Sequence, residues 1–291
     1  MYDRVNLTIY VEEPKRLRQR LPPLDETHSA ERGTFAYAGY VCGLRLSLHG
    51  HNLRVRGSLP GFIGAGFPPA TVATVARQRL EEMLGMDMGA ARVSRLEVYA
   101  DLPLAHPPAA YLPSYLALSR HEPSRYPGKS VTFVTAKRTA ILYDRFVKTG
   151  RDVDRGIARF EVRHMKGGVP LLFGRVTTLA DLALPAFRRT AADEWERQYH
   201  AIEKARALAP LAETKDYARW HLLHGYIARG LDTVLDEIYG FRVSGTLGKS
   251  QTAEMRRSVL ALVNDPRLTA PCPLLAEADA LIRESADRMR A

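Results

Sequence analysis

Two strand-like segments, Thr139–Phe146 and Ile157–Met165, carry residue types that can act on a phosphate group. In both, polar and apolar side chains alternate with a period of two, which is typical of a strand with one wet and one buried face. The polar face of the pair carries Tyr143, Arg145, Arg159, Glu161 and Arg163. A tyrosine, a carboxylate and several guanidinium groups on one face can hold a nucleophile, a metal ion and a phosphate together.

A third segment, Val93–Leu102, repeats this pattern and places Glu97 opposite its apolar residues, two positions after Arg95. If the strands share a sheet, Glu97 and Glu161 point the same way. Paired carboxylates attract Mg²⁺ or Mn²⁺, which prefer oxygen ligands, and arginine can bind a phosphodiester bidentately. The same pattern is also expected of cross-strand salt bridges on a solvated sheet face, and the spacing leaves both interpretations open.

His49 and His51 are spaced like the His-x-His pair of many metal-dependent nucleases. In a strand, residues i and i+2 share a face and can reach one ion. Gly50 and Asn52 favour a turn instead, because both tolerate a positive φ. We therefore keep two interpretations, of which the first makes His51 a metal ligand and the second places both histidines in a solvated turn.

Tyr143 is a candidate nucleophile. A tyrosine hydroxyl near a divalent ion and an arginine can ionise and attack phosphorus, which gives a phosphotyrosine linkage. The alternative is an ordinary residue of an amphipathic strand, and the alternation does not separate Tyr143 from the other tyrosines among the 13 in the chain.

The order of elements predicts an α+β protein, because strands dominate the first half and helices the second. The other segments with strand character are Val5–Val11, Phe35–Leu48, Leu53–Gly57 and Val131–Val134. The segments with helical spacing are Thr71–Met86, Pro107–Leu118, Ala191–Leu208, Thr214–Tyr239, Ser250–Asn264 and Leu274–Met289. Pro14–Gly33 and His121–Ser130 are expected to be loops, and Pro185 to interrupt or kink a helix. We place a catalytic domain at residues 1–175 and a helical, DNA-binding region at 176–291.

Composition favours a globular protein with a polyanionic partner. Hydrophobic residues make up 46% of the chain, and 42 Lys and Arg against 32 Asp and Glu give a formal net charge of +10. Nucleic acid is the first partner to consider for such a charge, although an arginine-rich proteome also produces it. Two widely separated cysteines, no signal peptide and no long apolar run predict a cytoplasmic protein without a membrane partner.

Four short segments, in order, resemble the gene II type replication initiators of filamentous phages and their phage and plasmid relatives. The segments are Arg54–Phe62, Val93–Glu97, Arg138–Tyr143 and Ala158–Arg163. They span roughly the first 170 residues, and no match extends beyond about residue 190. The resemblance implies an antiparallel sheet backed by helices, in the style of the HUH nucleases, followed by the helical region.

The resemblance also implies rolling-circle replication. Such an enzyme nicks one strand of a supercoiled origin with a tyrosine, stays on the 5′ phosphate, leaves a 3′-OH primer and later rejoins the displaced strand, in some cases with a host helicase. By motif position, Tyr143 matches the nucleophile, and Glu97 and Glu161 match metal ligands. The family's Gly-His-Asn is replaced by Gly64-Ala65-Gly66, so a histidine ligand is missing or is supplied by His49 or His51.

We therefore expect a nicking and joining DNA endonuclease that uses Mg²⁺ or Mn²⁺ and binds single-stranded DNA and a supercoiled origin. The expected metal ligands are Glu97, Glu161 and His51; the catalytic residues are Tyr143 and Arg159; the DNA-binding residues are Arg95, Arg145, Arg163, Arg256 and Arg257. Two alternatives remain. One is a nucleic-acid-binding regulator without catalysis, and the other is an enzyme on a small phosphorylated substrate, which requires a compact pocket.

Overall fold

A ten-stranded sheet forms the centre of the computed structural model, which describes residues 1–21, 25–29, 34–64 and 66–291. Its strands are β1 (Tyr2–Tyr10), β2 (Asp25–Ser29), β3 (Thr34–Val41), β4 (Leu44–His49), β5 (Asn52–Ser58), β6 (Arg92–Pro103), β8 (Glu122–Tyr126), β9 (Ser130–Val134), β10 (Arg138–Asp144) and β11 (Ile157–His164). They lie in the order β2-β3-β4-β5-β1-β6-β11-β10-β9-β8, and all neighbours are antiparallel.

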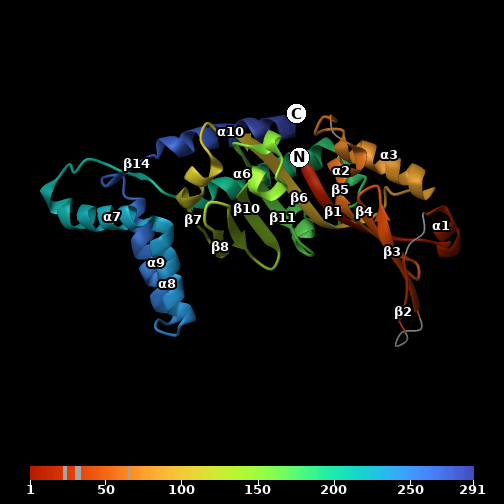
Figure 1. The fold of residues 1–291 in the computed structure, drawn as a ribbon, viewed down its shortest axis with the longest axis horizontal. Helices are drawn as coiled ribbons and strands as arrows, with labels where there is room; N and C mark the ends of the chain where they lie inside the picture. Colours follow the sequence, from red (N-terminus) through yellow and green to blue (C-terminus); the bar gives the residue numbers. More distant parts are fainter. Residues whose placement is uncertain (22–24, 30–33, 65) are drawn as a thin grey trace.

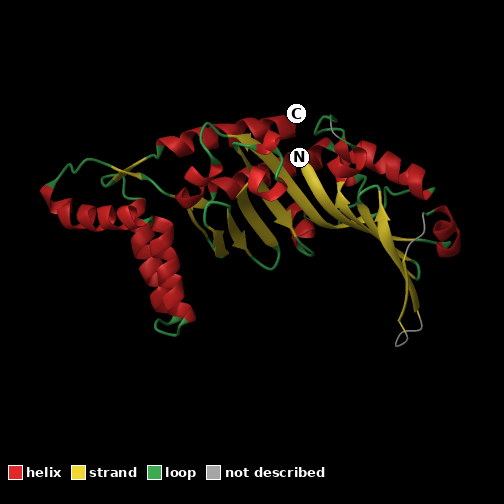
Figure 2. Cartoon of the chain, viewed as in Figure 1, coloured by secondary structure: helices red, strands yellow, loops and turns green. Residues whose placement is uncertain are grey.

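Helices and two small strand pairs complete the chain (Figure 2). The helices are α1 (Pro14–Arg20), α2 (Leu59–Ile63), α3 (Val72–Leu84), α4 (Arg145–Thr149), α5 (Gly168–Phe173), α6 (Pro185–His200), α7 (Tyr217–Arg229), α8 (Leu231–Val243), α9 (Lys249–Val263) and α10 (Pro273–Arg290). The strand pairs join β7 (Tyr115–Leu118) to β12 (Ile202–Lys204) and β13 (Ala207–Leu208) to β14 (Thr269–Ala270). The predicted α+β class with a central antiparallel sheet backed by helices is confirmed.

One face of the sheet, here called the covered face, packs against helices (Figure 1). Helix α6 contacts β6 and β11, α10 contacts α6 and β6, and α2 contacts β1 and β5. The covered face of β6 and β11 presents Leu96, Val98, Phe160 and Val162, all of which are fully buried. Trp195 of α6 packs on Phe160 with ring centroids 5.3 Å apart. The opposite face of the same strands, here called the open face, carries the charged residues described below.

Helices α7, α8 and α9 form a separate unit with its own apolar core, which includes Leu223, Leu235 and Val259. The antiparallel pair α8 and α9 projects away from the sheet (Figure 1). Helices α6 and α10, in contrast, share the main core with the sheet through residues such as Trp195 and Ile282. Packing therefore groups the sheet with α6 and α10, and sets α7 to α9 apart, whereas the sequence placed one division near residue 175.

Several predicted elements differ from the structure because the effect of a proline or a glycine depends on its position in the fold. The segment 121–130 contains β8, which tolerates Pro123 because an edge strand does not need every N–H group. Pro185 opens α6 in its first turn, where its missing N–H group costs nothing, instead of kinking a helix. Gly230, with φ of +86°, divides the predicted helix Thr214–Tyr239 into α7 and α8.

Other differences lie near the ends of the sheet. The predicted strand Phe35–Leu48 is two strands, since the chain turns at Cys42 and Gly43 with φ of +49° and +79°. The predicted loop Pro14–Gly33 contains α1 and β2, although 22–24 and 30–33 lie outside the described residues. The predicted helix Pro107–Leu118 is two short 3₁₀ turns, Pro108–Ala110 and Leu112–Ser114, followed by β7. Within the described parts of the chain, no helix has the length and hydropathy needed to cross a bilayer.

Candidate active site

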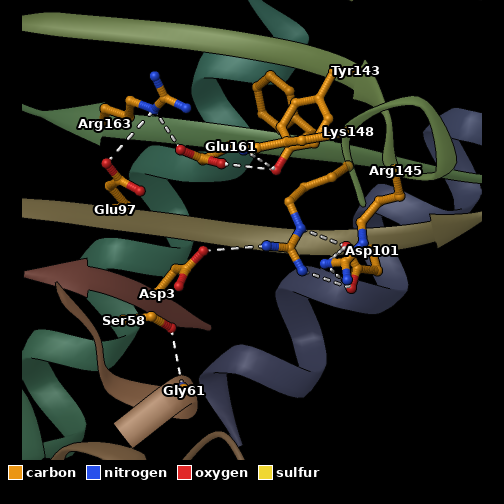
Figure 3. A network of polar contacts seen from close by, with 12 residues as sticks. Asp3, Ser58, Gly61, Glu97, Asp101, Tyr143, Arg145, Lys148, Glu161 and Arg163 are labelled. Carbon is orange, nitrogen blue, oxygen red and sulfur yellow. Dashed lines mark hydrogen bonds and ion pairs between the residues drawn. The ribbon is translucent and has the colours of Figure 1, made fainter. Parts of the chain in front are cut away.

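Three carboxylates from three adjacent strands converge on the open face of the sheet (Figure 3). One oxygen each from Asp3 of β1, Glu97 of β6 and Glu161 of β11 lies within 4.8 Å of the other two. Glu97 and Glu161 are only 2% and 1% exposed. Three oxygen ligands at this spacing fit a hard divalent cation such as Mg²⁺ or Mn²⁺. We call these three residues the acidic trio.

Strand register explains how the trio forms. Pairing of β6 with β11 sets Glu97 opposite Arg163 and Glu161 opposite Tyr99, on the face away from the helices. Asp3 reaches the same face through a bulge, since the three-residue step from Tyr2 to Val5 matches a two-residue step on β6. The predicted strand Val5–Val11 did not include Asp3, and a strict period of two extended back from Val5 would assign Asp3 to the apolar face.

Arginines surround the trio. Arg163 Nε lies 2.5 Å from Glu161 Oε1 and 3.7 Å from Glu97 Oε1, while Arg95 pairs with Glu97 from the same strand. Arg159 Nη1 lies 3.2 Å from Asp3 Oδ2. Of the arginines that the sequence singled out, Arg95 and Arg163 therefore contact the two predicted carboxylates, and Arg159 contacts Asp3.

The two buried glutamates respond differently to this setting. Burial and the nearby Glu161 carboxylate raise the pKa of Glu97 to about 7, despite Arg163 and Arg95. Burial also opposes ionisation of Glu161, but Arg163, Lys148 and a hydrogen bond with Glu97 together outweigh it and lower the pKa of that carboxyl group. The arginines therefore leave residual repulsion between the two carboxylates. A cation held between the two carboxylates would relieve this repulsion.

Tyr143 contacts the trio from β10 (Figure 3). Its hydroxyl group donates a hydrogen bond to Glu161 Oε2 at 3.3 Å and accepts one from Lys148 Nζ at 3.1 Å. The tyrosine is 4% exposed, and burial followed by the Glu161 charge raises its pKa above the ordinary value. The sequence-predicted nucleophile and carboxylate are therefore in direct contact.

Lys148 was missed because the predicted strand continued to Phe146. In the structure β10 ends at Asp144, whose side chain accepts a hydrogen bond from Val147 N and caps α4. The short helix returns Lys148 to the Tyr143 ring, with Nζ 4.3 Å from the ring centroid. An Asp followed by a change from alternating to helical spacing was the signal available in the sequence.

A second ionic network supports this arrangement. Arg159 binds Asp101 with two hydrogen bonds, of 2.6 and 2.9 Å, and stacks over Tyr99 at 3.8 Å from the ring centroid. Arg145, predicted on β10, instead begins α4 and pairs with Asp101 at 3.2 Å and with Asp154 at 3.1 Å. This network ties α4 to β6 and β11, so it fixes the helix that carries Lys148.

The structure does not bring His51 to the trio. His51 lies in the β4–β5 turn, where Nδ1 contacts Val11 O at 2.7 Å and the ring stacks on Tyr10. Tyr10 and Asp3 lie seven residues apart on β1, or about 23 Å at the usual rise of a strand. His49 is the exposed last residue of β4, so the turn interpretation holds for His51 but not for His49. The third carboxylate beside Glu97 and Glu161 is that of Asp3. In the segment Gly64-Ala65-Gly66, which replaces the Gly-His-Asn of the phage initiators, Ala65 lies outside the described residues.

Arg256 and Arg257 lie on α9 in the three-helix unit, apart from the sheet core. Arg257 is exposed, and burial next to Arg125 lowers the pKa of Arg256. Arg125 also pairs with Asp236 of α8 at 2.6 Å and so links the sheet edge to this unit. Their predicted contact with DNA therefore concerns a surface other than the trio.

No protein-family model and no curated protein sequence matches the chain. Among solved structures, the chain is similar to a rolling circle replication initiator protein from Geobacillus stearothermophilus. The two share 15% sequence identity with a TM-score of 0.41, over 74% of this chain and 89% of that chain.

Proposed function

We propose that the protein is a metal-dependent tyrosine DNA endonuclease and strand transferase that initiates rolling-circle replication. One observation carries the proposal: the hydroxyl group of Tyr143 is hydrogen-bonded to a carboxylate of the acidic trio. A nucleophile, a set of hard oxygen ligands and guanidinium groups within one cluster are the parts that phosphodiester transfer needs. The order of the four sequence segments that resemble phage initiators supports DNA as the substrate.

In the proposed nicking step, Tyr143 Oη forms a bond to phosphorus as the bond from phosphorus to the 3′ oxygen breaks. The tyrosine proton passes to water while Glu161 orients Oη through its hydrogen bond, and the departing 3′ oxygen takes a proton from water. Lys148 stabilises the charge that develops on Oη, because its ammonium group already donates to that atom. Rejoining is the reverse, with a 3′-OH as the attacking group.

Asp3, Glu97 and Glu161 would hold the divalent cation. When bound, the cation supplies positive charge that neutralises the scissile phosphate and favours the ionised form of Tyr143. Without such charge, burial keeps the pKa of Tyr143 above its ordinary value. The proposed chemistry is therefore dependent on the metal, and protonation of Glu97 opposes it.

Adduct formation tests this proposal. The protein is incubated with Mn²⁺ and a labelled pool of random single-stranded DNA, and then with a pool of supercoiled plasmids. Protein–DNA adducts that survive denaturation are collected, and the attached strands are sequenced. We expect an adduct in wild type that is absent with EDTA.

A matched control is Tyr126→Phe, since Tyr126 is 64% exposed on the edge strand β8. This variant should retain the adduct, whereas Tyr143→Phe should lose it and still bind DNA. If the wild type binds DNA in a salt-sensitive way and forms no adduct with either pool, the non-catalytic regulator becomes the better account.

A further inference from the structure

A groove lined by five cations lies beside the acidic trio on the same face of the sheet. Its volume is about 430 Å³, and no acidic residue lines it. The cations are Arg54 and Arg56 of β5, Arg92 and Arg95 of β6, and Lys166 just after β11. We call this feature the basic groove.

Strand register arranges four of these cations in two rows. Across β5, β1 and β6, Arg56 lies opposite Asn6 and Asn6 opposite Arg95, so these three side chains share a face. Arg54 and Arg92 form the second row, with Thr8 of β1 between them. Each row thus places two arginines on either side of a neutral polar residue, with their Cα atoms about 10 Å apart at the usual spacing of strands.

The groove has more positive charge than the protein neutralises. Across the described residues, the side chains of Arg54, Arg56 and Arg92 form neither an ion pair nor a hydrogen bond, whereas Arg95 pairs with Glu97. Arg56 also lies directly opposite Arg45 of β4, which is likewise exposed. Like charges in directly opposed positions destabilise a sheet. The arginines of the groove therefore repel one another, and a bound polyanion would reduce this repulsion.

The groove and Tyr143 lie on opposite sides of the trio. Across the sheet the order is β5, β1, β6, β11 and β10, so the trio stands between Arg56 and Tyr143. Arg159 lies between Tyr143 of β10 and Asp101 of β6, and from Asp101 strand β6 runs back through Glu97 to Arg95 and the groove. Asn6, in the groove floor, is three residues from Asp3, about 10 Å at the rise of a strand.

This placement defines which part of a DNA strand the groove receives. In an in-line displacement at phosphorus, the attacking and leaving oxygens lie on opposite sides of the phosphorus atom. The attacking oxygen is that of Tyr143, so the 3′ oxygen departs toward β1 and β5. We propose that the basic groove binds the backbone of the single-stranded segment upstream of the nick, which ends in the 3′ oxygen. This polarity rests on the proposed nicking reaction, whereas the groove's affinity for a single strand does not.

Bound in this way, the upstream segment stays near the trio after nicking. Its 3′-OH remains placed for the reverse attack on the phosphotyrosine, and the strand leaves only when the phosphate contacts break. The groove would thus set the balance between rejoining and release of the primer end.

A first experiment measures the groove without nicking. Binding of a fluorescein-labelled 12-residue oligothymidylate in EDTA is followed by anisotropy at several salt concentrations. For Arg54→Ala/Arg56→Ala we expect affinity to fall about tenfold at low salt, and the salt slope to decrease by about 1.4, since each single-strand phosphate contact contributes about 0.7. Arg92→Ala, on another strand, should lower the slope by about half as much. Arg283→Ala is the control, because Arg283 is exposed on α10, which packs on the covered face. Unchanged affinity and slope in the groove variants would overturn the proposal.

A second experiment tests polarity with the nick sequence that adduct sequencing provides. Neutral methylphosphonate linkages are placed either upstream or downstream of the nick. Upstream neutralisation should slow adduct formation by the wild type about tenfold. In Arg54→Ala/Arg56→Ala it should have little further effect, because that variant has already lost the arginine contacts to the upstream phosphates. A selective loss with downstream neutralisation would contradict the polarity. If the proposed function itself is wrong, the wild type forms no adduct with any of these substrates. Binding of oligothymidylate in the first experiment would still show whether the groove binds a single strand.

Discussion

The two faces of the central sheet bury side chains by different means. On the covered face, Leu96 and Phe160 are excluded from water by α6 and α10. On the open face, Glu97 and Glu161 are just as inaccessible, yet arginines and Tyr143 surround them instead of apolar helices. The first kind of burial stabilises the fold, whereas the second stabilises a charge arrangement that keeps the pKa of Glu97 near 7. We expect mutations on the open face to affect chemistry and those on the covered face to affect stability.

The largest effect is expected from neutralising the trio. Glu161→Gln should reduce adduct formation at least about 100-fold, because it removes a charged metal ligand and the carboxylate that orients Tyr143 Oη. Glu97→Gln and Asp3→Asn should weaken Mn²⁺ binding in calorimetric titrations. Normal Mn²⁺ affinity in all three variants would assign the trio to salt bridging alone.

The pH dependence of metal binding tests the charge arrangement on the open face. The pKa of Glu97 is raised to about 7, and a carboxyl group must lose its proton to bind a cation. Mn²⁺ affinity of the wild type should therefore fall as pH decreases below about 7, by up to about tenfold per pH unit. Glu97→Gln, with weaker binding throughout, should lack this step. A wild-type affinity that is flat between pH 6 and pH 8 would contradict the account.

Lys148→Ala is expected to have an intermediate effect. The variant removes the hydrogen bond to Tyr143 Oη, so adduct formation should slow by about 10- to 100-fold while Mn²⁺ affinity is retained. Its pH–rate profile should move to higher pH, because the ammonium group no longer favours the ionised tyrosine. Lys148→Arg should restore part of the rate, and Lys129→Ala at the β8–β9 turn serves as the control. A wild-type rate in Lys148→Ala would remove the lysine from the mechanism.

The smallest effect on chemistry is expected at His164, a polar residue on the covered face. It is fully buried, neither ring nitrogen has a hydrogen-bond partner within the described chain, and burial lowers its pKa to about 3. Because the unfolded chain binds a proton near pH 6.5, folding stability is lost as pH falls from about 6.5 toward 3. At pH 5 this loss amounts to about 2 kcal/mol.

His164→Leu should remove that loss. Urea unfolding should show that the free energy of unfolding falls less between pH 8 and pH 5 in the variant than in wild type, by about 2 kcal/mol. Adduct formation at neutral pH should be unchanged. Equal pH dependence in the two proteins would mean that His164 is not buried as a neutral group.

Alternation in the sequence predicted the open face of β6 and β11, because regular strands obey a period of two without knowledge of their neighbours. It therefore placed Glu97 and Glu161 together. It could not place Asp3, since a bulge depends on the pairing of β1 with β6. Lys148 was missed because the cap at Asp144, which ends β10, was not recognised in the sequence. The position of His51 required the distance along β1, which only tertiary structure supplies.

The fold was predictable to a similar extent. Periodicity located the central strands and α3, whereas Pro123 and Pro185 were misinterpreted because their effect depends on an edge strand and a helix start. The packing of α6 and α10 onto the sheet was not visible in the order of elements, because helical spacing gives an apolar stripe but not the surface that it covers.

Mapping of the adduct on the protein is the most direct test of the central claim. After reaction with Mn²⁺ and single-stranded DNA, nuclease and trypsin digestion should give the peptide Thr139–Arg145 carrying a nucleotide through its 5′ phosphate, with fragmentation placing the mass on Tyr143. Tyr143 is the tyrosine of that peptide. A nucleotide on Tyr99 or Tyr126 would contradict the assignment of the nucleophile, and the absence of any nucleotidyl peptide, with binding retained, would contradict the proposed chemistry.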